Sequence, residues 1–158
     1  MDFGRRVWRE PRLLELMPLF NDTERVLRFA GGAPDESLEN ATGALLEQLP
    51  ARDGTVYAFS MDMKPAFSKT GSMLCMAYLL KKRLRCTTVL GGLMYAEMFR
   101  ELMKFDFIDY AVSSLDLYSF SGHYSMAALL GELEKGAPDF ESVPGLVYRA
   151  PQGGGLRM

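Results

Sequence analysis

The 158-residue sequence predicts an α/β domain built on an open parallel sheet. Three short β-prone runs lie at residues 56–60, 87–90 and 109–112, and each is followed by a longer segment with helical periodicity. Strands that alternate with helices form parallel sheets, joined by right-handed crossovers. Val89 and Leu90 belong to a continuous apolar run, which is typical of a strand buried on both faces. We therefore expect helices on both faces of the sheet.

Before the first strand, the sequence predicts two helices and one ambiguous segment. Residues 11–20 have the apolar spacing of a short helix. Residues 25–29 are compatible with a short strand or with a helix, because so short a segment does not distinguish the two periods. Residues 37–49 carry an apolar stripe, which predicts a helix that packs on the sheet and that Pro50 ends.

The segments that follow the three strands predict helices over residues 67–84, 94–105 and 121–133. Ser68 or Thr70 is available to cap the first of these helices, and Ser121 is available to cap the last. A short strand at 143–149 closes the pattern. The expected architecture is a three-layer open sheet of the Rossmann-like or flavodoxin-like type.

Composition indicates a globular protein with three segments. With 48% hydrophobic and 24% charged residues, the chain can bury a core. We divide it into a helical or irregular extension (1–36), the Rossmann-like domain (37–150) and a linker or tail (151–158), which is rich in glycine.

Charge and hydropathy exclude two classes of partner. A net charge of −2 does not favour nucleic acid, and the basic residues 81–85 are read as a solvated helix end rather than a phosphate site. No apolar run spans a bilayer and no signal sequence opens the chain, so we expect a cytoplasmic protein that does not enter membranes.

Metal and hydrolytic chemistry lack the residues that they need. Cys75 and Cys86 lie outside any paired-cysteine motif and are read as reduced core thiols. The single histidine, His123, opens a helix, where an exposed position is a simpler interpretation than a catalytic base. We therefore expect no catalytic residue and no protein metal ligand.

The candidate binding site lies where the parallel strands end, because ligands bind outside the carboxyl ends of such strands near a switch in strand order. The candidate cofactor-binding residues are Ser60, Met61, Asp62, Gly91, Gly92, Leu93, Ser113 and Ser114. The two glycines permit positive backbone angles and close approach of a ring or phosphate, although a tight turn explains them equally well. The serine hydroxyls can bind a nucleotide tail or cap helices. A methionine can lie against a flat cofactor or pack within its loop.

A series of motifs resembles a known family. Thr88-Val-Leu-Gly-Gly92 and a helix precede Phe107-Ile-Asp-Tyr-Ala-Val112, and a second helix precedes Val143-Pro-Gly-Leu-Val-Tyr-Arg149. Over roughly residues 56–149, this series resembles the cobalamin-binding domain that precedes the catalytic domain of radical S-adenosylmethionine enzymes. The resemblance implies that the corrin ring lies over the strand ends and that the nucleotide tail enters the sheet crevice. It also implies a radical S-adenosylmethionine domain or protein as partner, acting on a peptide or small natural product.

The chain departs from this family in four places. The turn after Val112 reads Ser113-Ser-Leu-Asp116 instead of Gly-Glu-Gly-Glu, and residues 1–10 lack the usual first strand. The Asp-x-His-x-x-Gly motif is missing, so any cobalamin would have no protein histidine on cobalt. The cysteine motif for an iron-sulfur cluster is also missing. Cluster and S-adenosylmethionine are therefore expected only in a separate domain, and this chain alone has no catalytic core.

A second class of function stays open. Tyr118, Phe120 and Tyr124 can dock a partner protein or leader peptide on a module that keeps the sheet but binds no cofactor. The aromatic segment between Ser114 and Gly122 distinguishes the two classes, because the cofactor interpretation fails if this segment fills the crevice.

Overall fold

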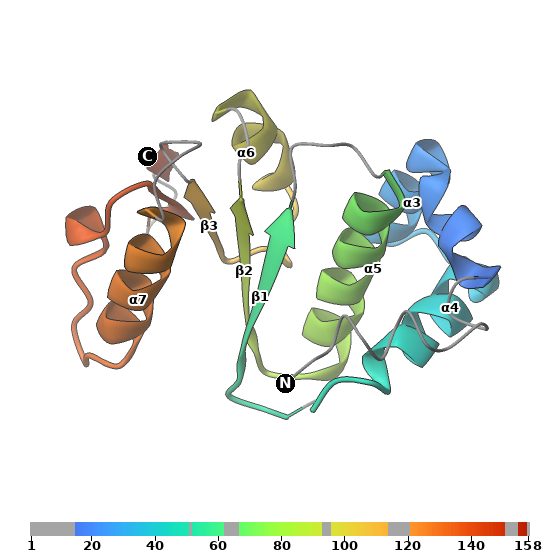
Figure 1. Cartoon of the computed structure of the whole chain (residues 1–158), viewed down its shortest axis with the longest axis horizontal. Coiled ribbons are helices and arrows are strands. Elements are labelled where there is room, and N and C mark those ends of the chain that lie inside the picture. Colours follow the sequence, from blue (N-terminus) through green and yellow to red (C-terminus); the bar gives the residue numbers. More distant parts are fainter. Residues whose placement is uncertain are drawn as a thin grey trace. The chain divides into compact units, whose positions relative to one another are not determined.

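The computed structural model describes residues 15–50, 52–61, 67–92, 96–113, 121–150 and 155–157 (Figure 1). The chain divides into two compact units. The first contains residues 1–55 and 64–87, and the second contains residues 56–63 and 88–158. The three segments expected from the sequence, 1–36, 37–150 and 151–158, remain a prediction.

The described part of the first unit is helical. Its elements are η1 (Met17–Asn21), α3 (Thr23–Ala30), α4 (Glu36–Leu46) and α5 (Phe67–Arg83). Helix α5 packs against the other three elements. At Gly71 of α5, an added Cβ would collide with the backbone carbonyl of Phe20, so η1 lies directly on the α5 backbone. Phe20, Leu38 and Leu79 are fully buried between these elements.

Several expectations for this unit need correction. Residues 25–29 form part of helix α3, because their buried side chains, Val26 and Phe29, recur at helical spacing. Helix α4 packs against α5 and η1, where the sequence predicted packing on the sheet. Helix α5 begins at Phe67, so the two expected caps at positions 68 and 70 lie inside it.

The sheet consists of β1 (Val56–Met61), β2 (Thr87–Gly92), β3 (Tyr110–Ser113), β4 (Leu146–Arg149) and β5 (Leu156–Arg157), adjacent in that order. Strands β2 and β3 are parallel, with Leu90 opposite Ala111, and Figure 1 shows β1 running in the same direction as β2. Strands β4 and β5 pair antiparallel. The predicted α/β fold with an open, Rossmann-like sheet is confirmed, and the sheet is mixed, with an antiparallel end.

Side chains on both faces of this sheet are buried. On one face, Val89, Val112 and Leu146 form a buried cluster with Leu129 of α7 (Ser121–Leu133). On the other face, Leu90, Ala111 and Val147 are buried as well. Their neighbour on β4, Arg149, donates to the backbone carbonyl of Met103 over 2.7 Å, just after α6 (Ala96–Leu102). The expected burial of Val89 and Leu90 on both faces is confirmed.

The connections of the second unit start and end close to their expected positions. Helix α6 occupies the middle of the segment 94–105, and α7 begins at Ser121 as expected. A hydrogen bond connects the start of β2 with the residue before β3: the Thr88 N–H donates to the Asp109 carboxylate over 2.8 Å. A 3-10 helix, η2 (Phe140–Ser142), precedes β4.

Candidate functional site

The sheet brings together three of the candidate binding residues at the carboxyl ends of β2 and β3. Gly92 pairs with Ser113, and Gly91 pairs with Val112. The Phe59 carbonyl oxygen lies 4.0 Å from the position of a Cβ on Gly91, so the end of β1, with Ser60, lies beside β2. We name Ser60, Gly91, Gly92 and Ser113 the strand-end site.

The two glycines of the strand-end site differ in their backbone requirements. Gly92 has φ = 132°, a conformation that side chains of L-residues strongly disfavour. A Cβ on Gly91 would instead make ordinary van der Waals contact, 3.8 Å from the Val112 carbonyl oxygen. Of the two glycines that the sequence allowed to take a positive backbone angle, Gly92 takes one and Gly91 does not.

The serine side chains of the strand-end site are accessible to different degrees. Ser60 is exposed and Ser113 is partly buried. The Ser113 backbone N–H donates to the Gly145 carbonyl over 2.8 Å, so this donor serves the sheet. The remaining candidates Asp62, Leu93 and Ser114 lie outside the described residues, as does the side chain of Met61.

The strand order changes how a ligand can approach this site. Across the five described strands the order follows the sequence, so these strands contain no reversal of order that opens a crevice. The crevice expected from the sequence is therefore absent among them. Any ligand at the strand-end site would lie over the strand ends.

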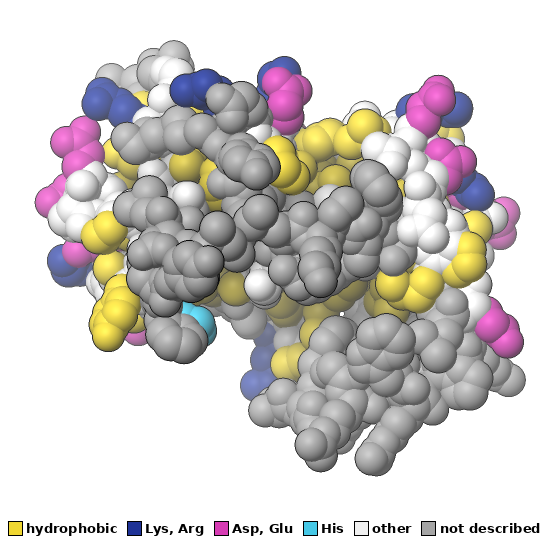
Figure 2. Space-filling model, turned by 45° about the horizontal axis from the view of Figure 1, so that its top comes forward, with side chains coloured by type: hydrophobic (Ala, Val, Ile, Leu, Met, Phe, Trp, Pro, Cys, Tyr) yellow, Lys and Arg dark blue, Asp and Glu magenta, His cyan; other side chains and the backbone are white. Residues whose placement is uncertain are grey.

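Metal-ligating groups do not gather among the described residues. Among the residues that the structure describes, no group of three or more His, Cys, Asp or Glu side chains can hold a metal ion. On the face drawn in Figure 2, acidic and basic side chains are interspersed and form no large patch of one sign. The four described residues of the strand-end site themselves offer hydroxyl and backbone groups to a ligand.

The cysteines and the histidine occupy the environments that the sequence predicted. Cys75 and Cys86 are free and buried. Burial raises the pKa of the Cys75 thiol to about 12, because an apolar environment disfavours the thiolate. His123 is exposed on the first turn of α7. The expected positions of these residues, two in the core and one at the surface, are confirmed.

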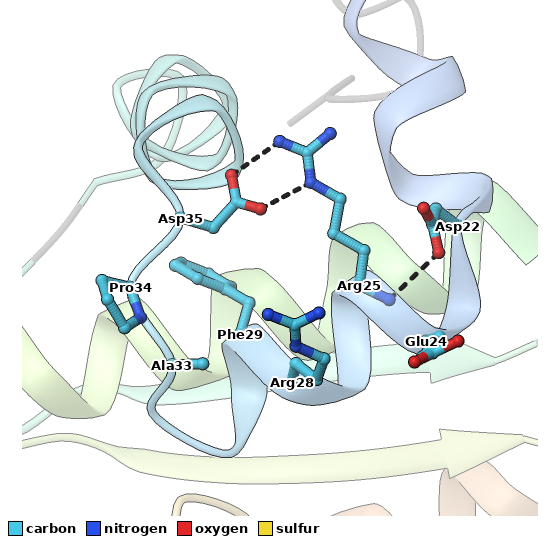
Figure 3. A pocket seen from close by; sticks show the side chains of 8 residues that line it. All are labelled: Asp22, Glu24, Arg25, Arg28, Phe29, Ala33, Pro34 and Asp35. Carbon is cyan, nitrogen blue, oxygen red and sulfur yellow. Dashed lines mark hydrogen bonds and ion pairs between the residues drawn. The ribbon is translucent and has the colours of Figure 1, made fainter.

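A polar pocket in the first unit was not predicted from the sequence. It has a volume of about 300 Å³ and lies along α3 and the turn that leads to α4 (Figure 3). Its lining residues are Asp22, Glu24, Arg25, Arg28, Phe29, Ala33, Pro34 and Asp35. The only hint in the sequence was an aspartate directly before the apolar stripe of α4, which is the position of a helix cap.

An ion pair dominates this pocket. The Arg25 guanidinium and the Asp35 carboxylate face each other in Figure 3 and form two hydrogen bonds, one of them 2.8 Å from Nη2 to Oδ1. Asp35 also accepts from the Leu38 N–H over 3.0 Å and so caps α4. These hydrogen bonds, first among them that from Arg25, lower the pKa of Asp35 to about 2. Because the two charges neutralise each other, we interpret the pocket as a structural helix corner.

A larger hollow of about 590 Å³ lies between α4 and α5, where Gly43, Leu80 and Arg83 are among its lining residues. It contains none of the candidate residues from the sequence.

No family model, curated protein or solved structure matches this chain. In the part of the chain that is described, no helix is long and apolar enough to cross a membrane.

Proposed function

We propose that this chain is a cobalamin-binding-type domain of, or partner to, a radical S-adenosylmethionine enzyme that acts on a peptide or small natural product. The observation that carries the proposal is Gly92, whose backbone angle of 132° at the end of a parallel strand accepts no side chain without strain. Its register partner, Ser113, places a hydroxyl at the same edge. On this proposal the chain has no catalytic core of its own.

The chemistry of the strand-end site fits such a cofactor. Cobalamin carries amide side chains and a nucleotide tail, and these groups are recognised by hydroxyl and backbone hydrogen bonds without a charged partner. Ser60 and Ser113 would supply the hydroxyls, and Gly92 would allow close approach to the backbone. When bound, cobalamin supplies a carrier for a methyl group or tunes a radical reaction. None of the four residues is a histidine, so cobalt would receive no imidazole from the strand-end site.

Equilibrium dialysis with hydroxocobalamin tests this proposal, with the purified chain alone and with its catalytic partner. We expect retention of cobalamin, with a spectrum that shows no histidine on cobalt. Gly92→Val should lower the affinity, because a branched side chain would occupy the approach to the backbone, whereas Gly91→Ala should retain it. Circular dichroism should show the same fold for both variants. A well-folded wild-type chain that retains no cobalamin in either form would refute the proposal.

A cofactor-free docking module is the second candidate, and one observation favours it. Tyr124 of α7 is 77% exposed, which is high for a large aromatic side chain. The other two aromatic residues proposed for docking, Tyr118 and Phe120, lie outside the described residues. Under this alternative, Tyr124→Ala should weaken capture of the partner, while hydroxocobalamin should not be retained.

A further inference from the structure

The outer face of helix α7 is largely apolar, although it is exposed. Tyr124 and Leu130 are 77% and 39% exposed, and Ala127 and Gly131 are exposed between them. Figure 2 shows hydrophobic surface close to the histidine, which marks the start of this helix. We name Tyr124, Ala127, Leu130 and Gly131 the α7 stripe.

The α7 stripe is a continuous surface. At 100° per residue, its four members fall within about 120° of the helix circumference, with Ala127 at the centre. The opposite side of the helix is used inside the domain, where Leu129 is fully buried in the core cluster. Glu132 is the one ionisable residue in the range 125–133, and it is turned inward, 8% exposed. Its carboxylate accepts from the Asp139 N–H over 2.9 Å and pairs with Lys135. The exposed His123 lies within the same arc as the stripe, between Leu130 and Ala127 on the helix circumference.

We propose that the α7 stripe is the contact surface between two copies of this chain, which pair antiparallel about a two-fold axis at Ala127. This inference does not depend on cobalamin binding. A two-fold axis between the two helices, perpendicular to both, makes them antiparallel. Each residue then faces a residue that lies toward the same side of the partner helix. Tyr124 of one copy would therefore face Gly131 of the other, while Ala127 would meet its own equivalent.

The shapes of these residues suit such a pairing. A Cβ built on Gly131 has no atom within 4 Å, so the surface above this glycine is open. The ring of Tyr124, which projects into solvent in the single copy, would cover that space. A small residue at the axis lets the two helix backbones approach closely. Tyr124 of each copy would thus meet a small residue of the other, while Leu130 would face His123 of the other copy.

The charges at the ends of α7 also favour an antiparallel second copy. The first turn of a helix carries a partial positive charge and the last turn a partial negative charge, so antiparallel helices attract each other. Glu134 is exposed just beyond the last turn and would lie beside the first turn of the partner helix, where a carboxylate is stabilising. A parallel pairing would instead place like ends together.

The area of one helix face predicts a weak dimer. Stable interfaces bury about 800 Å² on each partner, and one face of a helix as short as α7 offers less than that. We therefore expect a dissociation constant in the micromolar range or weaker, and a mass that rises with concentration.

Sedimentation equilibrium of the complete chain tests this proposal from low micromolar to near-millimolar concentration. The wild type should approach the mass of a dimer. Ala127→Glu should weaken dimerisation by about tenfold or more, because two carboxylates would meet at the axis. The matched control is Met98→Glu, which places the same charge on an exposed apolar position of α6, 43% exposed, and should not change the mass. Circular dichroism should show that both variants fold.

Disulfide trapping tests the position of the axis. After oxidation, Ala127→Cys should form a covalent dimer, whereas Met98→Cys should not. The native cysteines do not compete, because both are buried. A wild type that stays monomeric at every concentration, an Ala127→Glu variant that dimerises as the wild type does, or equal cross-linking at both positions would overturn the proposal. A stable monomer that binds a helix of another protein through Tyr124 would overturn it as well.

Discussion

Asp35 should contribute to stability through two separable interactions. Its carboxylate pairs with Arg25 and caps α4 through the Leu38 N–H. Asp35→Asn removes the negative charge and keeps an oxygen that can cap the helix. Asp35→Ala removes both. The difference between these two variants therefore measures the cap, and the loss caused by the first measures the ion pair.

The expected magnitudes follow from the structure. The pKa of Asp35 is lowered from 3.8 to about 2, and one pKa unit corresponds to about 1.4 kcal/mol, so the upper limit is about 2 kcal/mol. Because the Arg25 side chain is 35% exposed, solvent screening reduces this to about 1 kcal/mol. Loss of the cap adds about 1 kcal/mol. We expect Asp35→Asn to lose about 1 kcal/mol and Asp35→Ala about 2 kcal/mol.

The same ion pair should be visible in the pH dependence of unfolding. Because the pKa of Asp35 is lower in the folded chain, its contribution is complete above the unfolded pKa of about 3.8. It is lost as the pH falls through the folded value of about 2. Between pH 4 and pH 2, the wild type should therefore lose about 1 kcal/mol more than Asp35→Asn.

Urea denaturation followed by circular dichroism measures each free energy of unfolding. Glu47→Gln, at an exposed acid just beyond α4, is the matched control and should change stability by less than about 0.5 kcal/mol. Equal losses for the two Asp35 variants would refute the role of the cap. Parallel pH curves for the wild type and Asp35→Asn would refute the ion pair.

Three further predictions follow from single observations. Gly92→Ala should destabilise the chain by about 1–3 kcal/mol because of its positive φ, whereas Gly91→Ala should cost less than about 1 kcal/mol; similar urea midpoints would contradict this. Leu129→Ala should cost about 2–5 kcal/mol, because this side chain is 0% exposed in the core cluster, and a loss below about 1 kcal/mol would show that the site collapses. Cys75 and Cys86 should react with a thiol reagent at neutral pH only after unfolding, and a fast reaction of the native chain would contradict their burial.

Periodicity allowed much of the local structure to be predicted. The apolar stripe of α5 and the β-prone run of β2 mark both elements close to their observed bounds. Both signals depend on neighbours within a few residues, which the sequence displays directly. Residues 25–29 were ambiguous for the same reason, since a segment of this length holds too little of either period. Packing of Val26 and Phe29 in the first unit shows that it is helical.

The candidate site could be predicted only in part. Its position at the strand ends follows from an alternation of strands and helices, and Gly92 has the positive angle that its residue type permits. The sequence did not show that Gly91 lacks this requirement, because the backbone angle at a glycine depends on the turn that follows it. It also did not reveal the ion pair between Arg25 and Asp35. These residues are ten positions apart, and they meet only when α3 and α4 are both in place.

The sequence by itself determined most of the helical and extended segments, the absence of a cysteine cluster motif, and the glycine at the end of β2, because these depend on residue type and local spacing. Tertiary structure alone decided the order of the strands and the antiparallel pairing of β4 with β3. It also decided that the Arg149 guanidinium donates to the carbonyl of Met103, 46 positions away. The physical reason is that contacts between residues so far apart depend on how whole faces of the helices and the sheet become buried. Each residue contributes only a small part of that burial, so the local sequence does not show the outcome.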